Sequence, residues 1–356
     1  MNQRLHDLAA KAGKRKLDRV LIFDQANILA LTGVNCDAGC LELAGLGKPA
    51  RGRAGHVGGS PRVSFYTDFR YVPMVHRVAP KLKVGDLRRM MKRHPRRTER
   101  IGYESSVSHA RYLALVKAFP GATFVDVTDD LKALRAVKTP GEQAKLRAAV
   151  DLNDEIWTAA QREFRAGMTE REMAQVIKHM MIECGDGEAF DTIVCVGKNA
   201  AECHHEPDDT VWNGREPILV DMGVKLDGFC SDMTRNLAPK PSRLYRQVYD
   251  LVLKANRAAI AAARPGITGK ALDRVARDVI RKGGFGRCFG HSLGHGVGYE
   301  IHEAPTASKR DDTVLKPGMS VTIEPGVYLE DNLGVRIEDL VLITETGCEV
   351  LTHSAK

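Results

Sequence analysis

Long apolar runs are missing from this chain of 356 residues. No stretch of 18 consecutive apolar residues occurs, which excludes a membrane-spanning helix. The first 19 residues are basic but have no apolar centre and no small-residue cleavage site. They therefore differ from a signal peptide and favour an amphipathic helix instead. We expect a cytoplasmic protein that has no membrane partner.

Paired cysteines are missing as well. The eight cysteines are scattered along the chain and form no Cys-x2-Cys pair. In a chain of this length, that pattern indicates reduced thiols rather than a disulfide framework. Cys36 and Cys40 have the spacing of two metal ligands on a helix, but nothing nearby completes a ligand set. We interpret both cysteines as structural.

Aromatic residues are few, and none interrupts the densest basic run, Arg88 to Arg100. A basic run without aromatic residues or a nucleic-acid motif is typical of a solvated helix face, so we expect no nucleic-acid partner. Residues 1–135 carry 25 Lys and Arg against 12 Asp and Glu, a net charge of +13, whereas the remainder carries −5. This asymmetry predicts two domains, residues 1–135 and 136–356.

The first domain has strand-like runs that alternate with helical segments. Apolar and β-branched residues at 20–24, 63–67, 100–104 and 123–127 predict strands, and residues 25–27 predict a turn. The alternation indicates a small α/β domain.

Two capping boxes open the second domain. Thr139, Pro140 and Glu142 predict the start of a helix that continues through Phe164, and Thr169 with Glu172 predicts the next helix. A second pair of helices is predicted at 242–263 and from 268 to 283. Each helix pair leads into strands, which indicates two related halves.

Residues 218–235 predict a β-hairpin that turns at Asp227-Gly228, since Asp-Gly between apolar runs is a strong hairpin signal. The turn sets the register, so Gly223 faces Asp232 and leaves open space beside it. Asp221 and Asp232 then share one face, roughly 7–8 Å apart at the backbone. Two carboxylates this close predict a cation site, and a solvated pair of strand-end aspartates is the alternative interpretation.

Three further groups complete a possible ligand set. Glu324 and Glu338 flank a second turn near Asp331-Asn332, and His295 lies in a glycine-rich segment. Four carboxylates and one imidazole suit Mn²⁺, Co²⁺, Fe²⁺ or Zn²⁺. Two divalent cations would neutralise the four negative charges. Two such ions can share a hydroxide and polarise a carbonyl oxygen, as amide hydrolysis requires.

Seven short motifs occur in order between residues 139 and 350. They are Thr139-Pro140-Gly141-Glu142, Phe190-Asp191-Thr192-Ile193-Val194, Val220-Asp221-Met222-Gly223, Ser231-Asp232-Met233-Thr234-Arg235, Gly294-His295-Gly296-Val297-Gly298, Ile323-Glu324-Pro325-Gly326 and Arg336-Ile337-Glu338-Asp339. Together they resemble the pita-bread metallopeptidases, in the aminopeptidase P and prolidase branch. Residues 66–71 are similar to part of that branch's creatinase-type N-terminal domain. The resemblance implies an α/β creatinase-like domain, then an α+β pita-bread catalytic domain, in a homodimer.

The resemblance also implies a ligand set for two divalent metal ions, with Mn²⁺ as the first choice. Asp221, Asp232, His295, Glu324 and Glu338 would bind the ions, and Asp232 and Glu338 would bridge them. Glu324 would act as general acid and base for a hydroxide that bridges the ions.

The same resemblance assigns roles beyond the ligands. His302 would steady the tetrahedral intermediate, and His204 would lie near the scissile bond, although His205 could exchange roles with it. His291 would line a pocket for the proline ring, and Arg336 would be a charged support at the substrate-binding site.

These residues imply hydrolysis of the Xaa-Pro bond at the N-terminus of small peptides. Glu202-Cys203 stands where the family often has Leu-Pro, so the conformation of that loop is open. Thr306 stands where dipeptidases of the branch often have an arginine that binds the product carboxylate, although Arg310 could substitute. We therefore expect an Xaa-Pro aminopeptidase. The alternatives are an Xaa-Pro dipeptidase, a metal-free amidinohydrolase and a non-catalytic binding protein.

Overall fold

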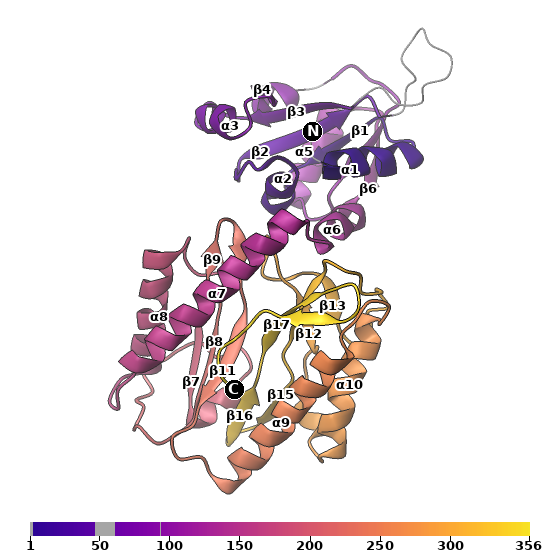
Figure 1. Cartoon of the computed structure of the whole chain (residues 1–356). Coiled ribbons are helices and arrows are strands. Elements are labelled where there is room, and N and C mark those ends of the chain that lie inside the picture. Colours follow the sequence, from indigo (N-terminus) through magenta and orange to yellow (C-terminus); the bar gives the residue numbers. More distant parts are fainter. Residues whose placement is uncertain (1–2, 47–60, 93) are drawn as a thin grey trace. The chain divides into compact units, whose positions relative to one another are not determined.

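The computed structural model describes residues 3–46, 61–92 and 94–356. The chain divides into two compact units, Met1–Arg135 and Ala136–Lys356 (Figure 1). Among the described helices, none is long and apolar enough to span a membrane.

The first unit is built on a six-stranded sheet with the strand order β4-β3-β2-β1-β5-β6. Its elements are α1 Gln3–Lys14, β1 Arg19–Ile22, α2 Gln25–Thr32, β2 Gly39–Ala44, β3 Arg62–Thr67, α3 Val72–Val78, β4 Lys83–Asp86, α4 Leu87–Met90, β5 Arg100–Tyr103, α5 His109–Ala118, β6 Thr123–Asp126 and α6 Thr128–Ala136. Strand β2 is antiparallel to both neighbours, whereas β4 is parallel to β3 and β5 is parallel to β1 and β6. The α/β organisation and the four predicted strands are confirmed.

The predicted turn at residues 25–27 is wrong. These residues form the first turn of α2, because the Asp24 side chain accepts a hydrogen bond from the Asn27 N–H and so caps the helix. The sequence also gave no prediction of β2, which contains Cys40. Cys36 and Cys40 are both buried, and Cys40 lies on a strand, so the helical spacing of two ligands does not arise.

The basic run is solvated but is not a helix face. Helix α4 has four residues, Leu87–Met90, and the residues from His94 to Glu99 have neither helix nor strand. The lysine and arginine side chains of the run are exposed at every described position, whereas Arg93 lies outside the described residues. Pro95 prevents the helix from continuing, because it lacks an N–H and disfavours helical backbone in the residue before it.

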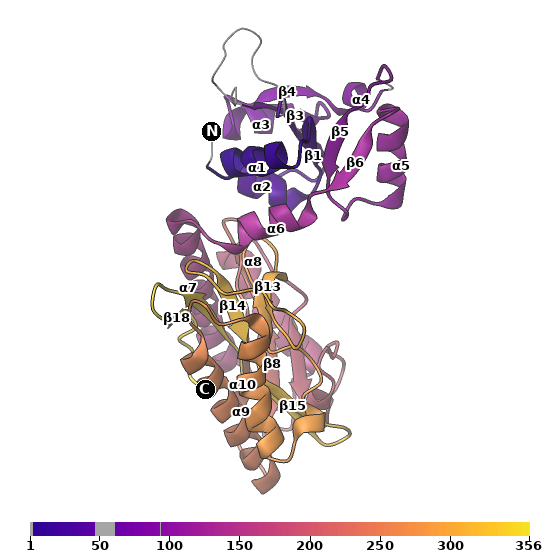
Figure 2. The ribbon, with the colours of Figure 1, turned by 90° about the vertical axis from the view of Figure 1, so that its right-hand side faces the viewer.

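The second unit combines two helix pairs with short antiparallel strands. Its elements are α7 Pro140–Glu163, α8 Glu170–Cys184, β7 Ile193–Val196, the 3-10 helix Gly197–Ala201, β8 Ile218–Met222, β9 Lys225–Leu226, β10 Phe229–Cys230, β11 Met233–Leu237, α9 Arg243–Ala262, α10 Gly269–Lys282, the 3-10 helix Gly286–Cys288, β12 Gly294–Gly296, β13 Glu303–Ala307, β14 Ser320–Ile323, β15 Gly326–Leu329, β16 Leu333–Arg336, β17 Asp339–Ile343 and β18 Cys348–Val350. The helices lie along the strands on one side (Figures 1 and 2). All four predicted helices of this unit are confirmed.

Both predicted capping boxes are present. The Thr139 side chain accepts from the Glu142 N–H while the Glu142 carboxylate accepts from the Thr139 N–H, and Thr169 and Glu172 repeat the arrangement at the start of α8. Each box satisfies helix N–H groups that would otherwise lack a partner.

The first hairpin has the predicted register but not the predicted open space. Asp221 pairs with Thr234, and the turn residues Asp227 and Gly228 both have positive φ, as a type I′ turn requires. A Cβ placed on Gly223 would lie 2.2 Å from the Ser231 carbonyl oxygen and 2.7 Å from the Phe190 ring. The glycine therefore permits a close approach of the backbone rather than leaving room beside Asp232.

The second hairpin repeats this design. Strand β14 pairs with β17 and β15 pairs with β16, with Gly326 opposite Arg336 and Ile323 opposite Asp339. The same register puts Glu324 opposite Glu338, in the gap where the ladder is interrupted. Asp232 likewise lies in the gap between β10 and β11. In both hairpins the ladder is interrupted beside acidic residues.

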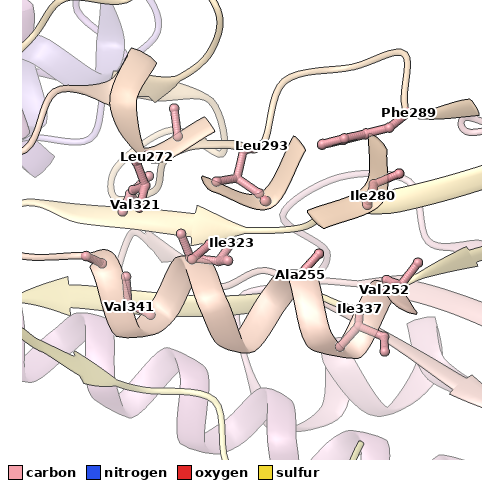
Figure 3. Close-up of a cluster of buried hydrophobic side chains, with 14 of the residues drawn as sticks. Val252, Ala255, Leu272, Ile280, Phe289, Leu293, Val321, Ile323, Ile337 and Val341 are labelled. Atoms are coloured by element: carbon pink, nitrogen blue, oxygen red, sulfur yellow. The ribbon is translucent and has the colours of Figure 1, made fainter. Parts of the chain in front are cut away.

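Two hydrophobic clusters hold the hairpins against the helices. Ile323 and Ile337 are fully buried, pack beneath α9 and α10, and immediately precede Glu324 and Glu338 (Figure 3). Val220 and Met222 occupy a second cluster with residues of α7 and α8, on either side of Asp221 in the sequence. Because side chains alternate along a strand, Asp221 points away from the helices that Val220 and Met222 contact.

The close approach at Gly223 gives the first prediction. Gly223→Ala will destabilise the second unit by about 1–3 kcal/mol, because the added Cβ must displace the Ser231 backbone. Gly141→Ala is the matched control, since a Cβ at that helical position meets nothing within 4 Å. Thermal unfolding of both variants measures the effect. A Gly223→Ala midpoint equal to that of the wild type would contradict this packing argument.

Candidate metal centre

One cavity of about 400 Å³ lies in the second unit. All nine residues that the sequence singled out contribute to its wall: Asp221, Asp232, His295, Glu324, Glu338, His204, His291, His302 and Arg336. They come from separate segments of the two halves, so the fold rather than the sequence brings them together.

Three of these residues form a compact group of possible metal ligands. One ligand atom each from Asp232, His295 and Glu338 lie within 4.8 Å of one another. The His295 Nε2 atom lies 3.5 Å from Asp232 Oδ2 and 3.4 Å from Glu324 Oε1. Its Nδ1 atom lies 3.1 Å from the Gly296 carbonyl oxygen, which favours a proton on Nδ1 and leaves Nε2 free to bind a cation.

Asp221 carries an unsatisfied buried oxygen. Its Oδ2 atom accepts a hydrogen bond from Arg336 Nη2 at 2.7 Å, whereas Oδ1 is buried and has no partner among the described residues. A buried carboxylate oxygen without a donor is costly unless a cation compensates it. The residues present therefore fit divalent cations, both by the hardness of the oxygen ligands and by this orphaned oxygen.

Neighbouring hydroxyl groups hold the glutamates in place. Thr234 donates to Glu338 Oε2 at 2.7 Å, and Thr322 donates to Glu324 Oε1 at 3.1 Å. Thr234 also accepts from Arg336 Nε at 3.0 Å. These contacts fix the carboxylate planes, as groups around a metal site commonly do.

The electrostatics of the cavity oppose ionisation of the carboxyl groups in the absence of cations. Burial raises the pKa of Asp232 well above its ordinary value, and the charges of Glu338, Asp221 and Glu324 add to the effect. Burial and the charges of Glu324 and Asp221 raise the pKa of Glu338 in the same way. Burial raises the pKa of Glu324 to about 8, although Arg336 opposes the rise.

The pKa values of two histidines in the cavity are lowered rather than raised. Burial and the neighbouring His302 lower the pKa of His295 to about 4, and burial and Arg336 lower the pKa of His291 to about 4. Both imidazoles are therefore neutral at pH 7, which is the form that can bind a metal ion or accept a proton.

Tyr328 contacts two of the cavity residues, although no sequence pattern predicts it as a site residue. Its hydroxyl lies 2.9 Å from His291 Nε2 and accepts from Arg336 Nη1 at 2.8 Å. The buried Arg336 guanidinium therefore donates to both Asp221 and Tyr328. The sequence could have indicated Thr234 as a site residue, because the predicted register already places it opposite Asp221. No such register indicates Tyr328, whose contacts depend on how the chain passes from β14 to β15 through Glu324 and Pro325.

The cavity wall bears on two alternatives that the sequence left open, and it includes neither His205 nor Arg310. His204 lines the cavity, whereas His205 is buried against Glu170 and does not line it, so an exchange of roles is not supported. Arg310 does not line the cavity either, and Thr306 binds Asp311. Among the described residues that line the cavity, Arg336 is the only arginine or lysine, and Asp221 already engages it.

Comparison with known proteins agrees with this geometry. The model of metallopeptidase family M24 matches residues 144–345, and the creatinase/prolidase N-terminal domain matches residues 4–137. These matches confirm the predicted fold class.

Three relatives illustrate the similarity. An Xaa-Pro dipeptidase of Pyrococcus furiosus is 33% identical over 360 residues, which cover 100% of this chain and 99% of the relative. An Xaa-Pro dipeptidase of Lactobacillus helveticus is 42% identical over 255 residues, 70% of this chain and 69% of the relative. The solved X-Pro aminopeptidase of Thermotoga maritima has a TM-score of 0.83 at 30% identity and covers 97% of each chain.

The raised pKa values predict how stability depends on pH. Between pH 6.5 and about 8, a folded chain without metal keeps a proton on Glu324 that the unfolded chain has released. Stability then falls as pH rises, by about 2 kcal/mol for one such carboxyl. The lowered pKa values of the histidines act only below 6.5 and have the opposite sign.

The measurement is the thermal midpoint after chelation, across this pH window, with the Mn²⁺-loaded protein as the control for groups outside the cavity. We expect the thermal midpoint of the chelated protein to fall as pH rises. The fall will be smaller with Mn²⁺, because the cations keep the carboxylates ionised at every pH in the window. Equal pH dependence in the two samples would refute the assignment of the cavity as a metal centre.

Proposed function

This chain belongs to metallopeptidase family M24 and is a metallo-exopeptidase, and we propose that it hydrolyses Xaa-Pro dipeptides with two bound divalent cations. The observation that carries the proposal is the buried Asp221 Oδ1 atom, which has no hydrogen-bond donor and lies in a cavity also lined by Asp232, Glu324 and Glu338. The substrate class rests on the full-length similarity to an Xaa-Pro dipeptidase.

Five side chains are proposed as the metal ligands: Asp221, Asp232, His295, Glu324 and Glu338. Asp232 and Glu338 would bridge the two sites. Mn²⁺ is the first candidate, followed by Co²⁺, Zn²⁺ and Fe²⁺, because hard oxygen ligands with one imidazole accept all four. The cations would activate a water molecule and polarise the scissile carbonyl group.

Glu324 is proposed to move the proton. It accepts a proton from the attacking water and delivers it to the leaving nitrogen of proline. The position of Glu324 supports the role, because its carboxylate lines the cavity and its Oε1 atom lies 3.4 Å from His295 Nε2, beside the other proposed ligands.

The histidines and Arg336 are proposed to position the substrate. His302, whose ring lies 4.3 Å from that of His295, donates a hydrogen bond to the oxyanion that forms at the scissile carbonyl. His204 lies near the leaving nitrogen, and His291 lines the pocket for the proline ring. Arg336 supports Asp221 and His291, the latter through Tyr328. A dedicated pocket suits proline, whose nitrogen carries no N–H once it is in a peptide bond.

An Xaa-Pro aminopeptidase is the second candidate. Thr306 occupies the position where an arginine would bind a free product carboxylate, and Arg310 does not line the cavity. A site without that cation is suited to longer peptides. We also propose that the enzyme forms a homodimer, which is an expectation carried by the family alone.

A substrate panel decides between the two candidates. We expect the Mn²⁺-loaded enzyme to hydrolyse Ala-Pro at least about tenfold faster, in kcat/KM, than Ala-Pro-Ala, a difference of about 1.4 kcal/mol. Ala-Ala and Ala-Ala-Ala serve as controls for the requirement for proline. The reverse preference would establish the aminopeptidase, and equal hydrolysis of the alanine controls would count against proline specificity altogether.

A conservative substitution tests the ligand set. Asp232→Asn will lower kcat/KM by at least about 100-fold and reduce bound metal, because it removes one negative ligand worth several kcal/mol. Asp227→Asn makes the same chemical change in the same hairpin, at a turn position that favours asparagine equally. Metal content by mass spectrometry and steady-state kinetics measure both variants. Full activity in Asp232→Asn would show that the assignment is wrong.

A further inference from the structure

A second cluster of titratable residues lies outside the cavity. Glu170, His205 and Asp208 have ligand atoms within 4.8 Å of one another. Glu170 is the first residue of α8 and is fully buried, and His205 is buried above it. Two of its residues, His205 and Asp208, belong to the segment between β7 and β8 that also carries Cys203 and His204 to the cavity wall.

The Glu170 carboxylate is fully occupied by protein donors. Its Oε1 atom accepts from the Val196 N–H at 2.6 Å and from Asn199 Nδ2 at 2.9 Å. Its Oε2 atom lies 2.7 Å from His205 Nε2 and accepts from the Asp208 N–H at 3.1 Å. A carboxylate offers about four acceptor positions, and all four are used here. Asp221 differs, because its Oδ1 atom has no donor, so the second cluster is not a metal site.

His205 supplies the positive charge that a buried carboxylate needs. Its Nδ1 atom lies 3.1 Å from Glu202 Oε2, so both ring nitrogens face carboxylates and both are in position to donate. Burial lowers the pKa of His205, but the hydrogen bonds to Glu170 and Glu202 outweigh it and raise the pKa above the ordinary value. The nearby Asp208 carboxylate acts in the same direction. The start of helix α8 also favours the negative charge of Glu170.

The Glu170 carboxylate anchors the segment that follows β7. Glu170 binds four positions between Val196 and Asp208, and His204 lies inside this span. From the other side, Arg336 Nη1 donates to the Cys203 carbonyl oxygen at 3.3 Å. The backbone on either side of His204 is therefore bound, while the His204 side chain itself is exposed in the cavity wall.

We infer that Glu170 and His205 form a positioning pair that holds the loop so that the His204 imidazole meets the substrate. The inference rests on the role of His204 in the proposed function. The pair touches neither substrate nor metal ligands and acts through His204. Loss of the pair displaces an imidazole that must stand within hydrogen-bond reach of the reacting atoms, and a shift of about 1 Å is enough to cost on the order of 100-fold in rate.

A double-mutant cycle on the full-length Mn²⁺-loaded enzyme tests the pair. His205→Leu will lower kcat/KM for Ala-Pro on the order of 10- to 100-fold with metal content unchanged. In a His204→Ala background, the same change will cost less than about twofold, since nothing is left to position. Equal losses in both backgrounds, or no loss in either, would overturn the inference.

Two variants separate positioning from general damage. His205→Gln keeps an N–H donor near the position of Nε2 and will retain activity within about threefold of the wild type. His179→Leu makes the same change as His205→Leu on an exposed face of α8 and will leave kcat/KM unchanged. A His205→Gln variant as impaired as His205→Leu would contradict the role of the donor.

A reporter that needs no turnover completes the test. Cys203 lies in the same loop, and its alkylation by iodoacetamide can be followed at the peptide level by mass spectrometry. We expect at least about fivefold faster alkylation in His205→Leu than in the wild type, because the loop loses its anchor. Unchanged alkylation would overturn the positioning pair itself, whereas an enzyme that hydrolyses neither Ala-Pro nor Ala-Pro-Ala would overturn only the proposed substrate.

The pH dependence of stability gives a second independent measure. A histidine with a raised pKa adds stability that is fully present below about pH 6.5 and is lost as pH rises through the raised value. The stability difference between the wild type and His205→Gln will therefore shrink as pH rises from 6 to 9. A difference that is constant over this range would contradict a charged His205.

Discussion

Repulsion between buried acidic groups is the constraint on which this structure depends. Asp221, Asp232, Glu324 and Glu338 line a single cavity, and one arginine, Arg336, offsets part of their charge. Without further positive charge, the protein favours protonated carboxyls over ionised ones. Bound cations reverse that preference, because they compensate the charge that burial penalises. The chemistry of the site and its stability therefore share one cause.

Apolar side chains make this concentration of charge tolerable. Each acidic residue adjoins a buried apolar residue, such as Val220 before Asp221, Met233 after Asp232 and Ile337 before Glu338. The aliphatic residues contact the helices, and strand alternation turns the carboxylates the other way. Burial of one such side chain contributes roughly 1.5–3 kcal/mol, so several together can outweigh the cost of bringing the acids into proximity.

Much of this arrangement follows from local sequence signals. The Asp227-Gly228 turn sets the register of one hairpin, and Thr139 and Thr169 with their glutamates mark two helix starts. Both signals depend on backbone groups within a few residues, so sequence alone reveals them. The meeting of the two hairpins depends on long-range packing, and no local pattern of residues reports it. The family resemblance supplied that part.

The wrong or open predictions each trace to one contact that the sequence pattern does not reveal. The segment Asp24-Gln25-Ala26-Asn27 is compatible with a turn by sequence, whereas the Asp24 side chain caps a helix there. The space beside Gly223 could not be judged, because Phe190 fills it from another segment. His204 and His205 are neighbours in sequence but face opposite surroundings, and only Glu170, from a distant helix, distinguishes them.

The facing carboxylates link the cohesion of the second unit to cation binding. The first hairpin packs on α7 and α8 and the second packs mainly on α9 and α10, while a smaller cluster that includes Phe229 of β10 and Leu340 of β17 joins the two halves. The buried ion pair between Arg235 and Asp339 joins them as well, whereas the carboxylates that meet in the cavity oppose their approach. A cation in the cavity would offset this repulsion, so binding would stabilise the contact between the halves and supply the site with its chemistry at the same time.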